Sequence, residues 1–408
     1  MADAASVAHL IRRTSFGPHP GQVATLVADP LETITANVLA AAPMPIGPPP
    51  PLEGENSWRA LARWWLQRMT TTTAGLHEKM TWFWHGHLTS SLDTADASQM
   101  WNQHLLLRTH ALGNFRDLLK AVTVDAAMLR YLNGDGSVAA HPNENYSREL
   151  MELFALGRGN YTQTDVTRGA RALAGYRVRW DTGAVEFDPT DGLASPVTFL
   201  GASVLRSNDV VDAVCNHTAC APWVVAKLHR YFVGVDPSVS RRSELATLFR
   251  SGNLEIRPVV ENIILHTSFQ SARMNRPRFP VEYIPGVMTA IAQPYNDGWG
   301  LLDAVGGLDQ MPFEPPNVAG WGYGTKWLSA GSAMVRAAAV QWNEAVNTIE
   351  SAPDVVGAAL DRCSLFDVSA RTRSSIQSAV DKLGSSDTWA RAWLALGLAA
   401  TSPEMELA

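Results

Sequence analysis

Apolar residues recur at intervals of three and four along most of this chain, for example through residues 56–69, 114–132 and 221–233. This spacing places side chains on one face of an α-helix, whereas a strand alternates at every second residue. No run of about eighteen apolar residues occurs, so we expect no helix that spans a membrane. The sequence therefore predicts a mainly α fold, a large multi-helix single unit.

One short region departs from the helical spacing. Residues 176–180 alternate in polarity, Asp181-Thr182-Gly183 is typical of a turn, and residues 184–187 alternate back. Two alternating runs joined by a short Gly-containing turn are typical of a β-hairpin. We expect one small β-hairpin insertion near residues 176–200.

A length of 408 residues allows one large domain or two smaller ones. The Pro-rich stretch after the first helices is short and is interpreted as a strap, not as a domain boundary. We therefore predict a single helical domain over residues 1–408. Its predicted parts are N-terminal helices at 1–42, the strap at 43–55, motif-bearing helices at 56–175, the hairpin at 176–201, and C-terminal helices at 202–408 with a Pro/Gly/aromatic loop at 311–327.

Charge and cysteine content limit the partners. The net charge is −6 and the basic residues are scattered, which argues against a nucleic-acid partner. The three cysteines, Cys215, Cys220 and Cys363, favour neither a disulfide framework nor a Cys-based metal site. Because Met1 to Leu10 lacks the pattern of a signal peptide, we expect a cytoplasmic protein. We also expect a small-molecule substrate and no membrane partner. The oligomeric state stays open.

The densest polar run extends from Asn143 to Phe154, within a predicted helix at 143–157. Asn145, Glu149 and Glu152 fall on one stripe of that helix, beside its apolar face. Carboxylates at a half-buried edge need a cation, because desolvating a lone charge costs several kcal/mol. We take Glu149, Glu152, Arg148 and Asn145 as the candidate catalytic residues. The alternative is structural, since Arg148 and Glu152 are spaced to form an ion pair.

His85 and His87 are the candidate imidazole ligands. If their segment stays helical, the two rings point about 180° apart and cannot bind one ion. If Gly86 breaks the helix, both rings lie on one side and can chelate a metal. A structural pair of histidines is the alternative. Together with Glu149 and Glu152, they form the predicted metal site.

A segment of prolines, glycines and aromatic residues extends from Met311 to Trp327 and excludes a helix. Ordered loops of this length often carry function, and glycines allow close approach of a ligand. We expect Trp321 and Tyr323, with Trp84, to line a cofactor or substrate pocket. The alternative is a buried aromatic loop that serves packing alone.

Several of these phrases resemble one known family. The residues that carry the resemblance are Trp84-His85-Gly86-His87, the run 143–154, and Pro315-Pro316-Asn317-Val318-Ala319-Gly320-Trp321. In that order they are similar to the bacterial domain-of-unknown-function family 1800. The resemblance implies a mainly helical single unit and no established general activity. The family's usual His-Asp pair after the hairpin is replaced here by Phe187-Asp188.

Mixed imidazole and carboxylate ligands suit iron, manganese or zinc, and a haem held by a histidine stays open. The leading hypothesis is a metal-dependent oxidoreductase whose metal, with iron as a candidate, is held by His and carboxylate ligands, and which acts on a small or apolar substrate. A metal-dependent hydrolase is the first alternative. The second is a non-catalytic helical binding scaffold with a structural buried Glu/Arg network.

Overall fold

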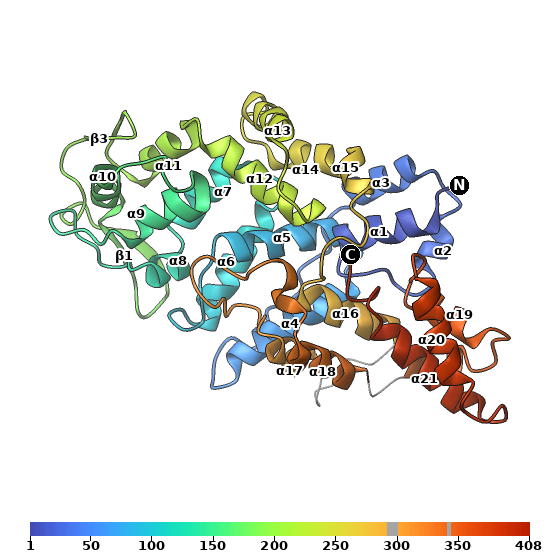
Figure 1. The fold of residues 1–408 in the computed structure, drawn as a ribbon. Helices are drawn as coiled ribbons and strands as arrows, with labels where there is room; N and C mark the ends of the chain where they lie inside the picture. The colour runs from blue at the N-terminus through green and yellow to red at the C-terminus, as the bar shows by residue number, and fades with distance from the viewer. Residues whose placement is uncertain (292–300, 341–343) are drawn as a thin grey trace.

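The computed structural model describes residues 1–291, 301–340 and 344–408. In these residues the chain forms 21 α-helices and only two small antiparallel sheets of two strands each, which confirms the mainly α fold (Figure 1). The two sheets lie at one end of the molecule and α19 to α21 at the other, with α5 and α16 between them. Residues 292–300 and 341–343 of the predicted C-terminal helices lie outside the described residues.

The helices before the first sheet are α1 (Ala4–Thr14), α2 (Gln22–Leu26), α3 (Leu31–Ala40), α4 (Ser57–Thr71), α5 (Gly75–His87), α6 (Ala97–Thr109), α7 (Phe115–Thr123), α8 (Ala126–Tyr131), α9 (Asn145–Glu149), the π-helix η1 (Leu150–Ala155) and α10 (Gln163–Leu173). Those after the sheets are α11 (Ser207–Asn216), α12 (Cys220–Val233), α13 (Val239–Ser251), α14 (Ile256–Leu265), α15 (Thr267–Gln270), α16 (Pro280–Ala290), α17 (Leu301–Gly307), the short 3₁₀-helix η2 (Gly324–Trp327), α18 (Ala330–Ala339), the 3₁₀-helix η3 (Glu344–Thr348), α19 (Val355–Arg362), α20 (Ala370–Val380) and α21 (Thr388–Ala400).

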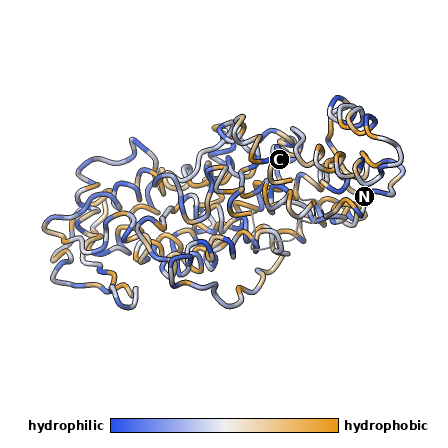
Figure 2. The backbone as a smooth tube through the Cα atoms, turned by 90° about the horizontal axis from the view of Figure 1, so that it is seen from below, coloured by the Kyte–Doolittle hydropathy of each residue, from blue (hydrophilic) through white to orange (hydrophobic). Residues whose placement is uncertain are grey.

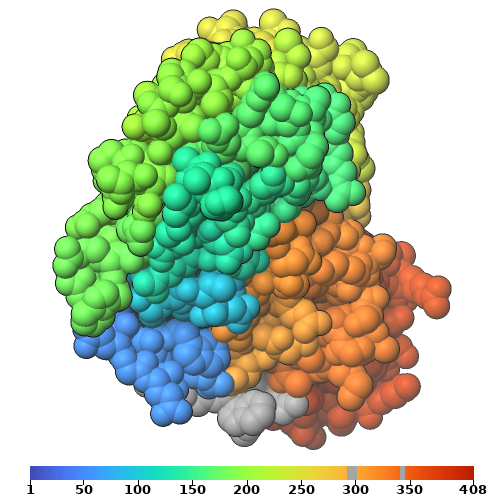
Figure 3. Space-filling model, turned by 90° about the vertical axis from the view of Figure 1, so that its left-hand side faces the viewer, coloured from blue at the N-terminus to red at the C-terminus, as the bar shows by residue number. Residues whose placement is uncertain are grey.

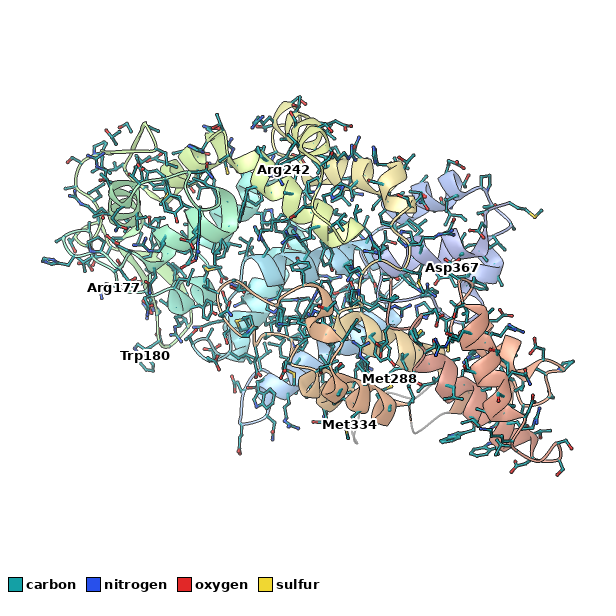
Figure 4. All side chains as sticks on the ribbon, viewed as in Figure 1. Arg177, Trp180, Arg242, Met288, Met334 and Asp367 are labelled. Carbon is teal, nitrogen blue, oxygen red and sulfur yellow. The ribbon has the colours of Figure 1, made fainter. Side chains whose placement is uncertain are left out.

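The predicted hairpin is confirmed, and a second one follows it. Strand β1 (Tyr176–Val178) pairs antiparallel with β2 (Val185–Phe187), in the register Tyr176 opposite Phe187. The second pair, β3 (Val197–Phe199) with β4 (Ala202–Val204), was not predicted, although its strands are as long as those of the first. Trp180 at the turn of the first hairpin is 91% exposed and points outward in Figure 4.

Local sequence explains where many of the helices begin. The Asp96 carboxylate accepts a hydrogen bond from the Gln99 backbone N–H at 2.9 Å, and the Gln99 side-chain oxygen accepts one from the Asp96 backbone N–H at 3.2 Å. Such reciprocal caps satisfy backbone donors that a helix start leaves unpaired. Orange and blue stretches alternate along the tube in Figure 2, as expected for amphipathic helices that bury one face. The buried faces form one apolar cluster that extends from Val7 to Met405.

Two buried carboxylates hold helices together. Glu78 on α5 is fully buried and receives Arg108 through two hydrogen bonds of 2.8 Å, Arg68 at 2.9 Å, and the Trp65 indole N–H at 2.8 Å. Arg68 also donates to the carbonyl of Pro45, which fastens the strap to α4. Buried ions are stable only when paired and hydrogen-bonded, so this network fixes the relative positions of α4, α5 and α6.

The second carboxylate is Glu282 on α16. It lies 2.6 Å from the Lys79 amine of α5 and 2.8 Å from the Arg276 guanidinium. Lys79 also donates to the carbonyl of Ser15, just after α1. Three segments distant in sequence therefore converge on one buried charge cluster.

Within the described residues, no helix is both long enough and apolar enough to cross a membrane. The thiols of Cys215, Cys220 and Cys363 are all free and buried.

Candidate functional site

The helix predicted over 143–157 is not one continuous α-helix. Residues 145–149 form α9, after which residues 150–155 continue as the π-helix η1. At its end the backbone N–H of Leu156 donates to the carbonyl of Met151, five residues earlier, at 2.8 Å. A π-helix of this kind adds one residue per turn and is often found at functional sites. The continuous α-helix was therefore a wrong prediction.

Side chains from two other helices explain the change of hydrogen-bond pattern. The His87 imidazole Nε2 lies 2.8 Å from the carbonyl oxygen of Phe154, and the Trp223 indole N–H donates to that of Leu153 at 2.9 Å. The last carbonyls of a helix have no partner within it and must find donors elsewhere. The end of η1 is thus held by α5 on one side and by α12 on the other.

The residues after η1 complete this cap. Asn160 donates its side-chain amide to the carbonyl of Leu156 at 2.9 Å. Gly157 has a φ of +81°, and a Cβ there would lie 2.6 Å from the Trp223 ring. Only glycine permits both this backbone conformation and this close approach. The close contact between the Trp223 ring and Gly157 therefore fixes the position of α12 relative to η1.

Helix α5 continues through Gly86 to His87, so the extended chelating geometry of the two histidines does not form. Whereas His87 contacts Phe154, His85 contacts the 311–327 loop, where its Nε2 accepts a hydrogen bond from the backbone N–H of Phe313 at 3.0 Å. His85 must then carry its proton on Nδ1, whereas His87, which faces a carbonyl, carries it on Nε2. Burial lowers the pKa of each imidazole to about 3, so both are neutral.

The 311–327 loop packs against α5. A Cβ on Gly320 would lie 2.2 Å from the carbonyl oxygen of Gly86, so glycine is required there. Trp321 is buried and stacks on Trp82, with ring centroids 4.9 Å apart. In Figure 3 the orange residues that include this loop lie directly beside the blue and teal residues of the N-terminal half.

The other predicted pocket residues lie in different surroundings. Trp84 is fully buried and donates its indole N–H to the carbonyl of Ala111 at 2.9 Å. Tyr323 is 38% exposed, and its ring meets Phe279 edge-on. Trp84, Trp321 and Tyr323 therefore contact different neighbours, and their place in a cofactor or substrate pocket stays a prediction.

The four predicted catalytic residues lie along α9 and η1. Glu152 is bound by the Arg158 guanidinium at 2.5 Å and by the Tyr161 hydroxyl at 2.7 Å, and these bonds lower the pKa of its carboxyl group. Arg148 pairs with Glu144 instead of Glu152. Asn145 is exposed and donates to the side-chain oxygen of Asn133.

Glu149 takes part in neither the Arg148–Glu144 nor the Arg158–Glu152 ion pair. It is half-buried, and no described residue forms a hydrogen bond with its side chain. Burial raises the pKa of the carboxyl group, and the nearby Glu152 adds to this shift. Glu149 and Glu152 are therefore close enough to interact, as their spacing predicted.

The predicted metal ligands do not share a centre. In the part of the chain that the structure describes, no three His, Cys, Asp or Glu side chains gather closely enough to hold a metal ion. His85 and His87 each use Nε2 in a hydrogen bond to a different backbone segment. Each Nε2 therefore already has a backbone partner, and binding of a metal or haem by these residues stays a prediction.

A groove that the sequence reasoning missed lies next to the capped end of η1. It has a volume of about 440 Å³, within the range of small-molecule sites. Its walls come from the end of η1, from α12 and from the start of α13. They are formed by Leu156, Asn160, Ala219, Pro222, Trp223, Ala226, Lys227, Arg230, Asp236 and Arg242.

The groove is basic. Arg230 pairs with Asp236, but Lys227 and Arg242 form no ion pair with any carboxylate among the described residues. The Lys227 amine lies over the Trp223 ring, 4.6 Å from its centroid. Desolvation and the charge of Arg230 lower the pKa of Lys227. Arg242, on α13, is labelled beside α12 in Figure 4.

A signal for this groove was present in the sequence. Trp223, Lys227 and Arg230 are spaced by four and three residues and so share one helical face. Lys227 also lowers the pKa of His87, which places the groove next to the predicted site. The two sites share the end of η1.

The family model described as "Protein of unknown function (DUF1800)" matches residues 9–407, and the chain belongs to this family. No curated protein and no solved structure shows significant similarity to the chain.

Proposed function

We propose that this protein is a helical binding scaffold that takes a small anionic ligand in the groove between η1 and α12. The observation that carries the proposal is the pair of cations, Lys227 and Arg242, which face a groove of about 440 Å³ without forming an ion pair with a described carboxylate. A carboxylate or phosphate bound in the groove would supply the counter-ion that both cations lack among the described residues. Its bonds to both cations would be charge-assisted and stronger than neutral hydrogen bonds.

The aromatic wall supports a ligand that also has an apolar body. Trp223 is held by its indole N–H at Leu153 and by its contact with Gly157, so the ring is already in place before a ligand arrives. Binding to a preformed surface avoids the entropic cost of ordering it. Pro222 and Ala226 extend the apolar surface beside the ring. An aromatic carboxylate fits this combination of charge and flat apolar area.

The buried networks around Glu78 and Glu282 support the scaffold part of the proposal. They involve α4, α5, α6 and α16, and α5 in turn holds η1 through His87. The groove is thereby built on helices whose positions are fixed, which is what a precise binding site needs.

Metal-dependent oxidation or hydrolysis of a small or apolar substrate stays a prediction. The separate hydrogen bonds of His85 and His87 do not favour it. Elemental analysis of protein purified without chelator is its test. A stoichiometric metal that is lost on Glu149→Ala, with the fold retained, would favour the enzyme hypotheses over the scaffold.

Calorimetric titration with benzoate tests the binding proposal, with neutral benzamide as the matched ligand. We expect benzoate to bind and benzamide to bind far more weakly, with benzoate affinity falling as salt is added. Lys227→Ala should weaken benzoate by about tenfold or more, since hydrogen bonds to charged groups contribute about 1.5–3 kcal/mol.

Lys326→Ala provides the control variant. Lys326 lies over Trp327 at 4.3 Å, much as Lys227 lies over Trp223, but it is exposed and outside the groove. Its removal should leave benzoate binding unchanged. Equal binding of benzoate and benzamide, or equal effects of the two lysine variants, would contradict an anion site in this groove.

A further inference from the structure

We propose that Lys227 is a nucleophilic amine that forms a Schiff base with the carbonyl carbon of a small oxo acid held in this groove. The inference rests on the anion binding proposed above and adds a covalent step to it. It differs from the metal hypotheses, because it needs neither a metal nor a redox partner.

The position of Lys227 distinguishes it from an ordinary surface lysine. It is half-buried on α12, its amine lies against the Trp223 ring, and Arg230 follows it on the same face of the helix. No described carboxylate forms an ion pair with it. Desolvation and the charge of Arg230 favour the neutral amine, which is the nucleophilic form, and they outweigh the opposite effect of Asp236, so the pKa of Lys227 is lowered.

The charges of the groove define the substrate class. A carboxylate is attracted to Arg242, the other cation without a carboxylate partner, while the carbonyl group can reach the Lys227 amine. The apolar part of the molecule then lies on Trp223 and Pro222. A small 2-oxo acid with an aromatic side chain combines these three features.

The reaction balances without an added reagent. The lone pair of the neutral amine attacks the carbonyl carbon, a C–N bond forms, and the π electrons of the carbonyl move to its oxygen. A proton passes from nitrogen to that oxygen, and a second proton transfer releases it as water while the C=N bond forms. Water in the open groove carries these protons, because Asp236, the carboxylate among the described lining residues, uses both oxygens on Arg230.

The chain contains internal comparisons for this amine. Its five lysines are Lys79, Lys120, Lys227, Lys326 and Lys382. Lys79 is enclosed in its ion pair with Glu282, and Lys120 pairs with Asp212. Lys326 is exposed and lies over an indole, as Lys227 does, but outside the groove. Lys326 is therefore the matched control for reactivity.

Borohydride reduction in the presence of phenylpyruvate tests the inference on the intact protein. Reduction converts a Schiff base to a stable secondary amine, which peptide mass spectrometry can locate. We expect one adduct per chain, at Lys227, formed at least tenfold faster than any adduct at Lys326. Benzoate should slow its formation by competing for the groove.

Lys227→Arg separates this inference from the binding proposal. The variant keeps the positive charge, so it should still bind benzoate, but it should form no adduct in the groove. If benzoate does not bind the parent protein, the proposed binding function fails. If benzoate binds but phenylpyruvate labels Lys227 no faster than Lys326, only the Schiff-base inference is overturned.

Discussion

The clearest test of the site architecture is the substitution His87→Phe. It keeps an aromatic ring of similar shape, which can still stack on Phe83, where the present ring centroids are 5.7 Å apart and nearly parallel. It removes only the N–H that faces the carbonyl of Phe154 at 2.8 Å. If His87 acts as a cap on η1, this loss should lower the free energy of unfolding.

The size of the loss follows from the surroundings of that carbonyl. Phe154 is fully buried, and leaving a buried acceptor without a donor costs about 1–3 kcal/mol. No charge is lost at pH 7, because burial lowers the pKa of His87 to about 3. For a chain of this length, each kcal/mol shifts the melting temperature by only about 1 °C. Urea denaturation is therefore the better assay.

The pH dependence provides a second signature. Because the pKa of His87 is lower in the folded state than in the unfolded state, the unfolded state binds the extra proton as pH falls below about 6.5. Between pH 7 and pH 5 the parent protein should lose roughly 2 kcal/mol of stability from this group. His87→Phe does not titrate, so its deficit at pH 7 should largely disappear at pH 5.

A matched variant makes the reasoning refutable. The side-chain amide nitrogen of His87→Gln can take the place of Nε2 and donate to Phe154, so this variant should recover most of the stability at pH 7. If both variants unfold at the same urea concentration as the parent at pH 7 and pH 5, the cap interpretation of His87 is wrong.

Three further outcomes can be measured by denaturation. Glu78→Gln should lower the free energy of unfolding by about 3–5 kcal/mol, because it leaves two buried guanidinium groups without their counter-ion. Glu144→Gln, at a half-exposed ion pair, should lower it by less than about 1 kcal/mol. Similar losses of stability in these two variants would contradict the reasoning. Gly320→Ala should destabilise more than Gly324→Ala, since both positions have φ near +75° but only the first would place a Cβ 2.2 Å from backbone. Burial raises the pKa of Asp125 to about 6 in the folded state, whereas the pKa in the unfolded state is near 4. The protonated carboxyl group therefore stabilises the fold fully below pH 4, and this stabilisation is lost as the pH rises through 6. Asp125→Asn should therefore raise stability at pH 7 but not at pH 4, and a gain at both would refute this account.

The helical fold could be predicted because its signal is local. Apolar spacing of three and four residues marks each buried face, and the turn at Asp181-Thr182-Gly183 marks the first hairpin. The second hairpin was missed although Val197–Phe199 and Ala202–Val204 are as long as the strands of the first, because its turn at Leu200-Gly201 lacks the Asp-Thr-Gly pattern that marked the first turn. The π-helix escaped for another reason, since its cause lies in His87 and Trp223, which are distant in sequence.

The sequence predicted which segments lie near one another, whereas the metal chemistry assigned to them stays a prediction. Glu149 and Glu152 are neighbours, and the 84–88 segment does contact their helix. The helical alternative already placed the rings of His85 and His87 on opposite sides, but the backbone segments that they contact, at Phe313 and Phe154, are distant in sequence. The sequence did not mark Lys227 as a candidate, because two features distinguish it only in three dimensions. Its amine lies over the Trp223 ring, and no described carboxylate forms an ion pair with it.

The π-helix also has a consequence for any comparison of related chains. A π-turn amounts to one residue inserted into an α-helix, so a relative that lacks it would carry one residue fewer between Leu150 and Ala155. An ungapped alignment across such a pair would match Glu149 correctly and assign Gly157 to the wrong position. Removing one residue from this turn in the laboratory would rotate everything after it by about 100°, and would turn Gly157 away from Trp223.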